Sequence, residues 1–228
     1  MMQNYYRKHF VNRAVMCVWL LAFFVSGCAG MAINEKTKTL DLTKESIVLM
    51  TVKTANNYKP IYQPNVQFIR IFTAGNKDKK DLHLFRATKP YNKVAQQFNE
   101  YLISINLPAG NYELKEITGQ GTDGFFNGNF VIPLYINFEL KPNKLVYLGH
   151  IEATNRKRAY DYELRAGSMI PLLDQAVTGF SGGTFDVNIY DNFDRDLAVF
   201  KKEYPVIGEY NDEKMILTPR KKALEETE

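Results

Sequence analysis

The sequence is poor in the residues that build metal sites and disulfide scaffolds. Its 228 residues include two cysteines, three histidines and one tryptophan. Two cysteines allow at most one disulfide, which excludes a scaffold of several disulfides, and a structural zinc site needs four ligands drawn mainly from cysteine and histidine, which are scarce here. A chain of this length can bury a sizeable hydrophobic core in one domain, so it does not need a disulfide or metal staple.

A strong excess of charge of one sign is also absent. The formal net charge is +4, but residues 1–27 contain Arg7, Lys8 and Arg13 and no acidic residue, which leaves 26 basic against 25 acidic residues in the remainder. A net charge of +1 gives no electrostatic basis for nucleic-acid binding. With 45% hydrophobic and 24% charged residues, the composition is that of an ordinary globular protein.

No apolar run is long enough to cross a bilayer. The longest, residues 14–25, would span about 18 Å as a helix, whereas the hydrocarbon core of a membrane is about 30 Å thick. Basic residues precede this run and small residues follow it, which is the pattern of an export signal. We therefore expect residues 1–27 to be a signal peptide that is removed.

The residues at the end of this signal are specific. Val25-Ser26-Gly27-Cys28 resembles the bacterial lipobox, in which a signal peptidase cuts before the cysteine. The resemblance implies that Cys28 becomes the first residue and carries a diacylglycerol group and an acylated amine. Alanine rather than aspartate at position 29 implies sorting to the outer membrane of a Gram-negative host. The alternative is a plain signal peptide or a membrane anchor with an incidental cysteine.

The remainder of the chain is predicted to be one β-rich domain. Residues 28–45 are polar and show no sustained period, so we expect a flexible tether after the lipidated cysteine. From residue 46 onward the pattern has period two, and residues 47–52 are apolar on both faces, as in a central strand. Nine candidate strands follow from this pattern: 47–52, 66–73, 82–87, 101–107, 112–117, 134–140, 145–152, 160–165 and 185–190. Many short strands separated by turns favour an antiparallel two-sheet sandwich over residues 46–205.

One helix is expected near the C-terminus. Residues 192–204 have acidic residues in the first turn, lysines in the last turn and an apolar stripe, and Pro205 ends the segment. The stripe should close one end of the sandwich. Residues 206–228 are predicted to be a C-terminal tail whose last ten residues fray.

A second resemblance supports the same fold. Leu107-Pro108-Ala109-Gly110-Asn111-Tyr112-Glu113-Leu114, followed by Tyr147-Leu148-Gly149-His150-Ile151, resembles a pattern in transthyretin-like and carboxypeptidase-regulatory-like sandwich domains of exported bacterial proteins. The matching residues are turn and core positions. The resemblance therefore implies a β-sandwich and supplies no catalytic residues.

Three patterns suggest chemistry, and each has a plainer explanation. Gly179–Gly183 matches G-x-S-x-G, but no histidine follows Ser181 to complete a hydrolase triad. Asn192, Asp194 and Asp196 have the spacing of a calcium loop, but the position that requires glycine is a leucine, so a capped helix explains them better. His83 and His150 are the only histidines after the signal, and a zinc site would need further carboxylate ligands. No metal or other cofactor is predicted.

The segment 119–129 is the most unusual stretch. Four glycines should give it freedom, and Phe125 and Phe126 could form an exposed aromatic anchor together with Asn127. The interpretation that we favour places both phenylalanines in the core at the start of the next strand. If they are exposed instead, Phe125, Phe126 and Asn127 form a loop that could bind a partner.

These observations predict a non-catalytic binding or assembly module, anchored through Cys28 in the outer membrane and facing the periplasm. We expect the chain to contact the membrane through its lipid. We also expect it to bind an envelope protein, either through an edge strand or through one of the end loops 119–130 and 174–183. Its oligomeric state does not follow from the sequence. Two alternatives are a ligand carrier with an internal apolar cavity, and a hydrolase in which Ser181 meets one of the two histidines.

Overall fold

The structure is a computed structural model that describes residues 29–75, 78, 81–169, 177–210 and 212–219. The expected signal peptide and Cys28 lie outside these described residues, as do residues 220–228 of the expected tail. Within the described part of the chain, no helix is long and apolar enough to span a membrane.

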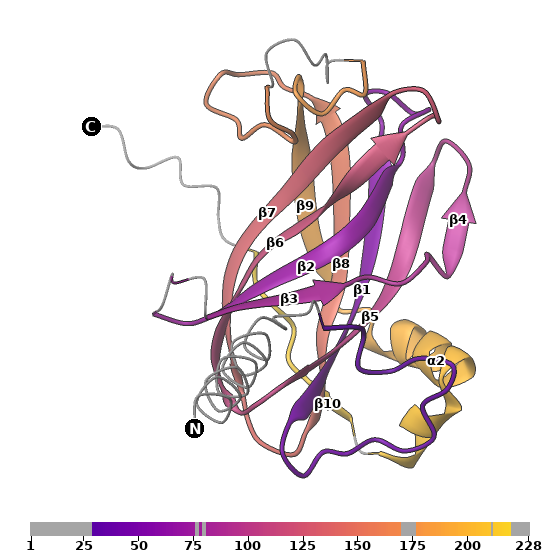
Figure 1. The fold of residues 1–228 in the computed structure, drawn as a ribbon, viewed down its shortest axis with the longest axis vertical. Helices are drawn as coiled ribbons and strands as arrows, with labels where there is room; N and C mark the ends of the chain where they lie inside the picture. Colours follow the sequence, from indigo (N-terminus) through magenta and orange to yellow (C-terminus); the bar gives the residue numbers. More distant parts are fainter. Residues whose placement is uncertain (1–28, 76–77, 79–80, 170–176, 211, 220–228) are drawn as a thin grey trace, which may run out of the picture.

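Two β-sheets pack face to face, and one α-helix lies against the second of them (Figure 1). The strands are β1 (Ser46–Asn56), β2 (Pro64–Thr73), β3 (Leu82–Arg86), β4 (Asn92–Val94), β5 (Phe98–Leu107), β6 (Gly110–Thr122), β7 (Asn127–Leu140), β8 (Leu145–Lys157), β9 (Gly183–Tyr190) and β10 (Asp212–Lys214). The helix α2 spans Phe193–Glu203 and is followed by a 3-10 helix, η2, at Pro205–Glu209. The predicted mainly β sandwich with one C-terminal helix is confirmed.

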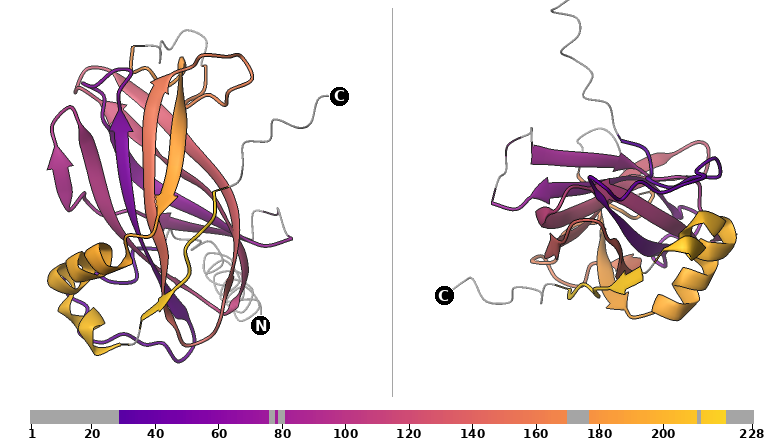
Figure 2. Two further views of the ribbon diagram at one scale, coloured as in Figure 1. Left: turned by 180° about the vertical axis from the view of Figure 1, so that it is seen from behind. Right: turned by 90° about the horizontal axis from the view of Figure 1, so that it is seen from below.

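The two sheets differ in their strand pairing. The first sheet has the strand order β3-β2-β6-β7, and all of its neighbours are antiparallel. The second has the order β10-β8-β1-β5-β4, with β9 also paired to β8. In this sheet β8 runs parallel to β1 and β10, so the sandwich is not purely antiparallel as predicted. The two further views in Figure 2 show the sheets from behind and from below.

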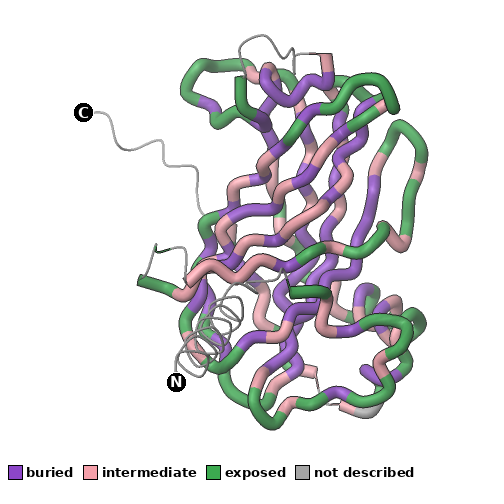
Figure 3. The backbone as a smooth tube through the Cα atoms, in the orientation of Figure 1, coloured by how far each residue is buried: buried purple, intermediate pink, exposed green. Residues whose placement is uncertain are grey.

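The main core fills the space between the sheets. In β7 every second residue from Gly128 to Leu140 is buried, which is the period-two pattern of a strand with one face on a core. Opposite it, Val48, Met50 and Val52 of β1 are completely buried. Figure 3 shows these buried stretches along the centre of the molecule. Each such aliphatic side chain stabilises the fold by about 1.5–3 kcal/mol.

A second core lies on the outer face of the second sheet. There Leu49 of β1 and Leu102 of β5 pack in one apolar cluster with Phe200 of α2 and Ile207 of η2. The helix therefore covers the outside of this sheet. The prediction that its stripe closes an end of the sandwich is wrong, because the alternate residues of β1 and β5 are apolar on both faces and need a cover on each.

The segment predicted as a flexible tether is instead packed on the body. The Ala29 N–H donates to the Leu84 carbonyl (3.1 Å), and the Arg86 N–H donates to the Ala29 carbonyl (3.0 Å), so the described chain begins paired with β3. Ile33 is completely buried, and Leu40 is 8% exposed. Both side chains are isolated apolar residues in a polar segment, and both pack in the second core.

The described part of the predicted C-terminal tail is also ordered. The strand β10 pairs with the start of β8, and the Leu217 N–H continues this pairing by donating to the Leu148 carbonyl (2.9 Å). The predicted fraying of the last ten residues falls almost wholly outside the described residues.

Candidate functional site

Three loops gather at one end of the sandwich, at the top of Figure 1, and we call this end the apex. They connect β1 to β2, β6 to β7, and β8 to β9. Hydrogen bonds join them: the Tyr62 hydroxyl donates to Asp123 Oδ2 (3.0 Å), and Asn56 Nδ2 donates to the Thr178 carbonyl (3.1 Å). The three loops therefore form one surface.

The apex carries most of the large apolar side chains that the described residues expose. We name as the apical surface the residues Ile61, Phe125, Phe126, Tyr160, Tyr162, Leu164 and Met169. Their exposed fractions range from 54% for Ile61 and Phe126 to 91% for Phe125. Exposed apolar residues that gather at one place indicate a contact surface, whereas singly scattered ones do not.

The hairpin tip between β6 and β7 is held in one conformation. Asp123 Oδ1 accepts the N–H groups of Phe125 (2.9 Å) and Phe126 (2.8 Å), and Gly124 has the positive φ of +99° that this tight turn requires. The same two backbone hydrogen bonds lower the pKa of the Asp123 carboxyl. The favoured interpretation that both phenylalanines enter the core is therefore wrong, because the turn directs them outward.

Two glycines of the segment 119–129 are required for close packing, and not for conformational freedom. A Cβ on Gly119 would lie 2.0 Å from the Asn65 carbonyl oxygen, and one on Gly128 would lie 2.1 Å from Thr178 Oγ1. Both glycines therefore allow close approach between neighbouring segments. Asn127 is the first residue of β7, is exposed, and pairs with Thr122, so it borders the apical surface.

The loop after β8 is organised around one buried carboxylate. Glu163 forms an ion pair with Arg156, and its Oε2 accepts the N–H of Ala159 (2.7 Å) and of Tyr160 (3.2 Å). The hydrogen bond from Arg156, followed by that from Ala159, lowers the pKa of Glu163 to about 2. The strand predicted over 160–165 is therefore wrong, because Glu163 turns the chain around itself.

On the outside of this loop two tyrosines form a flat pair. The rings of Tyr160 and Tyr162 are nearly parallel, at 7°, with centroids 5.2 Å apart. Both rings are exposed. The alternation that resembled a strand thus places the tyrosines outside and Glu163 inside.

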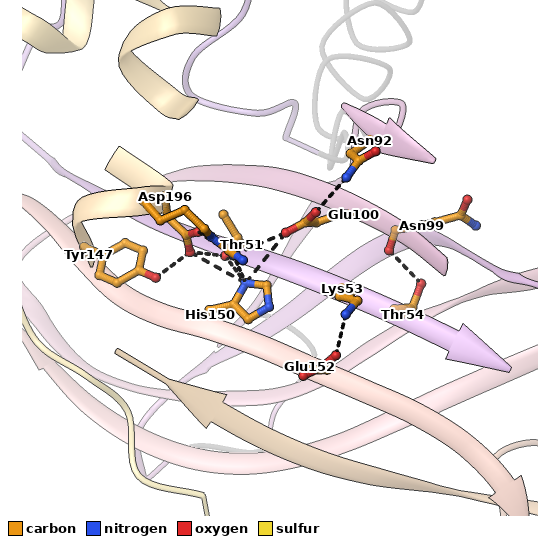
Figure 4. Close-up of polar contacts among 11 residues, drawn as sticks. Thr51, Lys53, Thr54, Asn92, Asn99, Glu100, Tyr147, His150, Glu152 and Asp196 are labelled. Carbon is orange, nitrogen blue, oxygen red and sulfur yellow. Dashed lines mark hydrogen bonds and ion pairs between the residues drawn. The ribbon is translucent and has the colours of Figure 1, made fainter. Parts of the chain in front are cut away.

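A second polar constellation lies under helix α2, against the outer face of the second sheet (Figure 4). Asp196 is completely buried and accepts hydrogen bonds from the hydroxyls of Thr51 and Tyr147, the latter at 2.6 Å. Arg195 Nε donates to Asp196 Oδ1 (2.8 Å), and Arg195 Nη2 reaches Glu100 Oε1 (3.3 Å). We call Thr51, Glu100, Tyr147, His150, Arg195 and Asp196 the α2 cluster.

A bulge in β8 brings two of these residues to one face. Tyr147 and His150 are three residues apart, which in a regular strand would place them on opposite faces. The pairing of β1 with β8 shifts register between Leu49 and Thr51, and Gly149 has a φ of +124° there. The extra residue turns both side chains toward α2. In the sequence, Gly149 within an apolar strand pattern is the signal for this bulge.

The α2 cluster contains a hydroxyl, an imidazole and a carboxylate, but not in a catalytic arrangement. A triad places the hydroxyl at one ring nitrogen and the carboxylate at the other. Here Thr51 Oγ1 (2.6 Å) and Asp196 Oδ2 (3.6 Å) both face His150 Nδ1. Thr51 and Asp196 are also completely buried, so a substrate could not reach them. The cluster attaches α2 to the sheet.

The carboxyl of Asp196 is strongly acidic in the folded state. Burial would raise its pKa, but the contact with His150 and the hydrogen bonds from Thr51, Tyr147 and Arg195 outweigh burial and lower the pKa to about 2. The same contacts work in reverse on Tyr147, whose pKa is raised by burial and by its hydrogen bond to Asp196.

Acidification is therefore expected to weaken the attachment of α2. The folded pKa of Asp196 is about 2, and its ordinary value is 3.8. The ionised carboxylate contributes about 2 kcal/mol of stability, which is complete above about pH 5 and is lost as the pH falls through about 2. In urea unfolding, the stability difference between the wild type and Asp196→Asn should shrink as the pH is lowered over this range. A constant difference would contradict the prediction.

The other predicted chemical sites are not assembled. His83 lies on β3 and contacts Thr73 Oγ1 (3.1 Å) and the ring of Tyr112, whereas Ser181 lies in the apex with its carbonyl accepting from Arg165 (2.7 Å). The structure therefore does not bring Ser181 to either histidine. Among the described residues, no group of three or more histidine, cysteine, aspartate or glutamate side chains could hold a metal ion.

One groove lies away from the apex, between β7 and the segment after β10. It has a volume of about 580 Å³ and is lined by Glu113, Tyr135, Ile136, Asn137, Phe138 and residues 215–218. Glu113 and Asn137 make its wall partly polar, and it is open to the surface. It therefore differs from the internal apolar cavity that a ligand carrier requires.

These features define the class of the protein as a β-sandwich with one helix-covered sheet and an aromatic apex. No known protein family, curated protein or solved structure matches the chain. The resemblance to transthyretin-like domains stays a prediction.

Proposed function

We propose that this chain is an outer-membrane lipoprotein that acts as a non-catalytic binding module of the cell envelope. Its lipid would be attached at Cys28, and its apical surface would contact an envelope component on the periplasmic side. The lipobox-like residues before Cys28 and the alanine at position 29 support the anchor and its location.

The observation that carries the proposal is that the apical surface exposes apolar side chains on turns that hydrogen bonds hold. Exposed apolar side chains lower solubility, and a flexible loop could fold them back onto the protein. Here Asp123 fixes the loop that carries Phe125, and Glu163 fixes the loop that carries Tyr160 and Tyr162. Because hydrogen bonds already fix these two turns, binding would cost little conformational entropy there.

The position of Ala29 sets how such an anchor would hold the body. Its pairing with β3 leaves one peptide unit between the ordered domain and Cys28. A lipid on Cys28 would therefore keep the β3 edge close to the headgroups, instead of suspending the domain on a long tether. Several acyl chains, and not one, are needed for stable anchoring.

The anchor is tested by metabolic labelling with palmitate. The wild type is expected to incorporate label and to fractionate with membranes, and Cys28→Ser is expected to lose both properties because the acceptor thiol is gone. Cys17→Ser is the matched control, since it removes the other cysteine within the expected signal and should leave labelling unchanged. Labelling that persists in Cys28→Ser would overturn the anchor.

A further inference from the structure

We infer that the apical surface docks on the surface of an anionic phospholipid bilayer, with Phe125 and its neighbours entering the interfacial region. This inference rests on the proposed function in one respect, the use of the apex as the contact surface, and it names the chemistry of the partner. It does not depend on the lipid at Cys28.

The residue types of the apical surface match a membrane interface. Phenylalanine, leucine, isoleucine and methionine gain free energy when they leave water for the boundary of the acyl chains. Tyrosine rings are enriched at the headgroup level, where the ring is in an apolar layer and the hydroxyl stays hydrated. Phe125 is the most exposed of these side chains, and the exposed tyrosine pair lies on a different loop.

The shape of the apex also favours lipid over a folded protein. The apolar side chains come from three separate loops, and none of them lines the groove between β7 and residues 215–218. A protein partner would need a pocket to fit each projecting ring, since packing at such interfaces matches that of protein interiors. A bilayer surface is soft and accepts several separate projections without such a fit.

The charges around the apex complement an anionic surface. Lys59, Lys157 and Arg165 form no ion pair among the described residues, whereas Arg158 is paired with Asp161 (3.8 Å). Among the described residues of the apex, Asp123 is the one carboxylate that lacks an ion pair, and it already accepts hydrogen bonds from the backbone N–H groups of Phe125 and Phe126. A lysine or arginine near the surface of anionic lipid strengthens binding about fivefold.

The inference is tested with the full chain reconstituted into vesicles whose phosphatidylcholine carries brominated acyl chains. Phe125→Trp, in a Trp19→Phe background, introduces a single indole at the tip of the β6–β7 hairpin. In vesicles that also contain phosphatidylglycerol, bromine should quench about half or more of the emission of this indole, because the ring reaches the acyl boundary. In phosphatidylcholine alone the quenching should be weaker.

Tyr190→Trp in the same background is the matched control, since Tyr190 is partly exposed at the end of β9 far from the apex. Its indole should not be quenched. Lys59→Glu combined with Lys157→Glu should remove the preference for phosphatidylglycerol. No quenching at position 125, equal quenching at both positions, or a blue shift at position 125 without quenching, as a protein contact would give, each overturns the inference. A failed palmitate labelling would leave this result unaffected.

Discussion

Replacing Asp196 by alanine is expected to lower the free energy of unfolding by about 3–5 kcal/mol, the usual effect of removing one member of a buried ion pair. The carboxylate is completely buried and is the shared acceptor for the hydroxyls of Thr51 and Tyr147. Without it both hydroxyls lose their acceptor, and Arg195 keeps only Glu100 as an anionic partner.

Urea or guanidinium unfolding at neutral pH measures this loss. Asp194→Asn is the matched control, because Asp194 lies in the same first turn of α2 but is exposed. It should cost no more than about 1 kcal/mol, the usual contribution of an acidic residue at a helix N-terminus. Similar losses for the two variants would mean that the apolar stripe of α2, and not the α2 cluster, holds the helix.

The regular part of the fold follows directly from the sequence. Local sequence patterns predicted eight of the ten strands in the described residues and the helix α2, whereas the short strands β4 and β10 were not predicted. These are local signals that tertiary contacts reinforce. The covering of the second sheet was harder to predict, because Ile33 and Leu40 stand alone in a polar segment and only the folded sheet offers them an apolar site.

The α2 cluster could not be predicted, because a regular strand would place Tyr147 and His150 on opposite faces of the sheet. Tyr147 and His150 face the same way only through the bulge at Gly149, and Asp196 looks in the sequence like any acidic residue of a first helical turn. For the apex, the unusual segment was predicted but the direction of its side chains was not. Phe125 and Phe126 stand out by composition, but their direction depends on the hydrogen bonds of Asp123, which periodicity does not report.

The loop over residues 160–165 shows where the period-two rule fails. Tyr160, Tyr162 and Leu164 alternate with charged residues, as on a strand with one apolar face. In the structure the apolar residues are exposed and a charged residue, Glu163, is buried with Arg156 as its partner. A buried carboxylate with three hydrogen-bonding partners outweighs the alternation, because leaving it unpaired would cost more than exposing the rings.

Replacing Phe180 by alanine is expected to cost about 3–5 kcal/mol, the usual effect of truncating a completely buried aromatic ring. Phe180 lies beneath the apex, with its ring 5.4 Å from that of Phe130, and a Cβ on Gly121 would come within 2.6 Å of it. The Phe180 ring therefore fills the space beside Gly121, which has no side chain. Its removal would create a cavity under all three loops.

Phe125→Ala is the matched variant, since it removes the same side chain from the same end of the molecule. It should change the free energy of unfolding by no more than about 0.5 kcal/mol, because the ring is 91% exposed and stabilises little in the free protein. Chemical denaturation of both variants measures the contrast. A loss above about 1 kcal/mol for Phe125→Ala would show that the ring holds the apex together, and the case for a contact surface would fail with it.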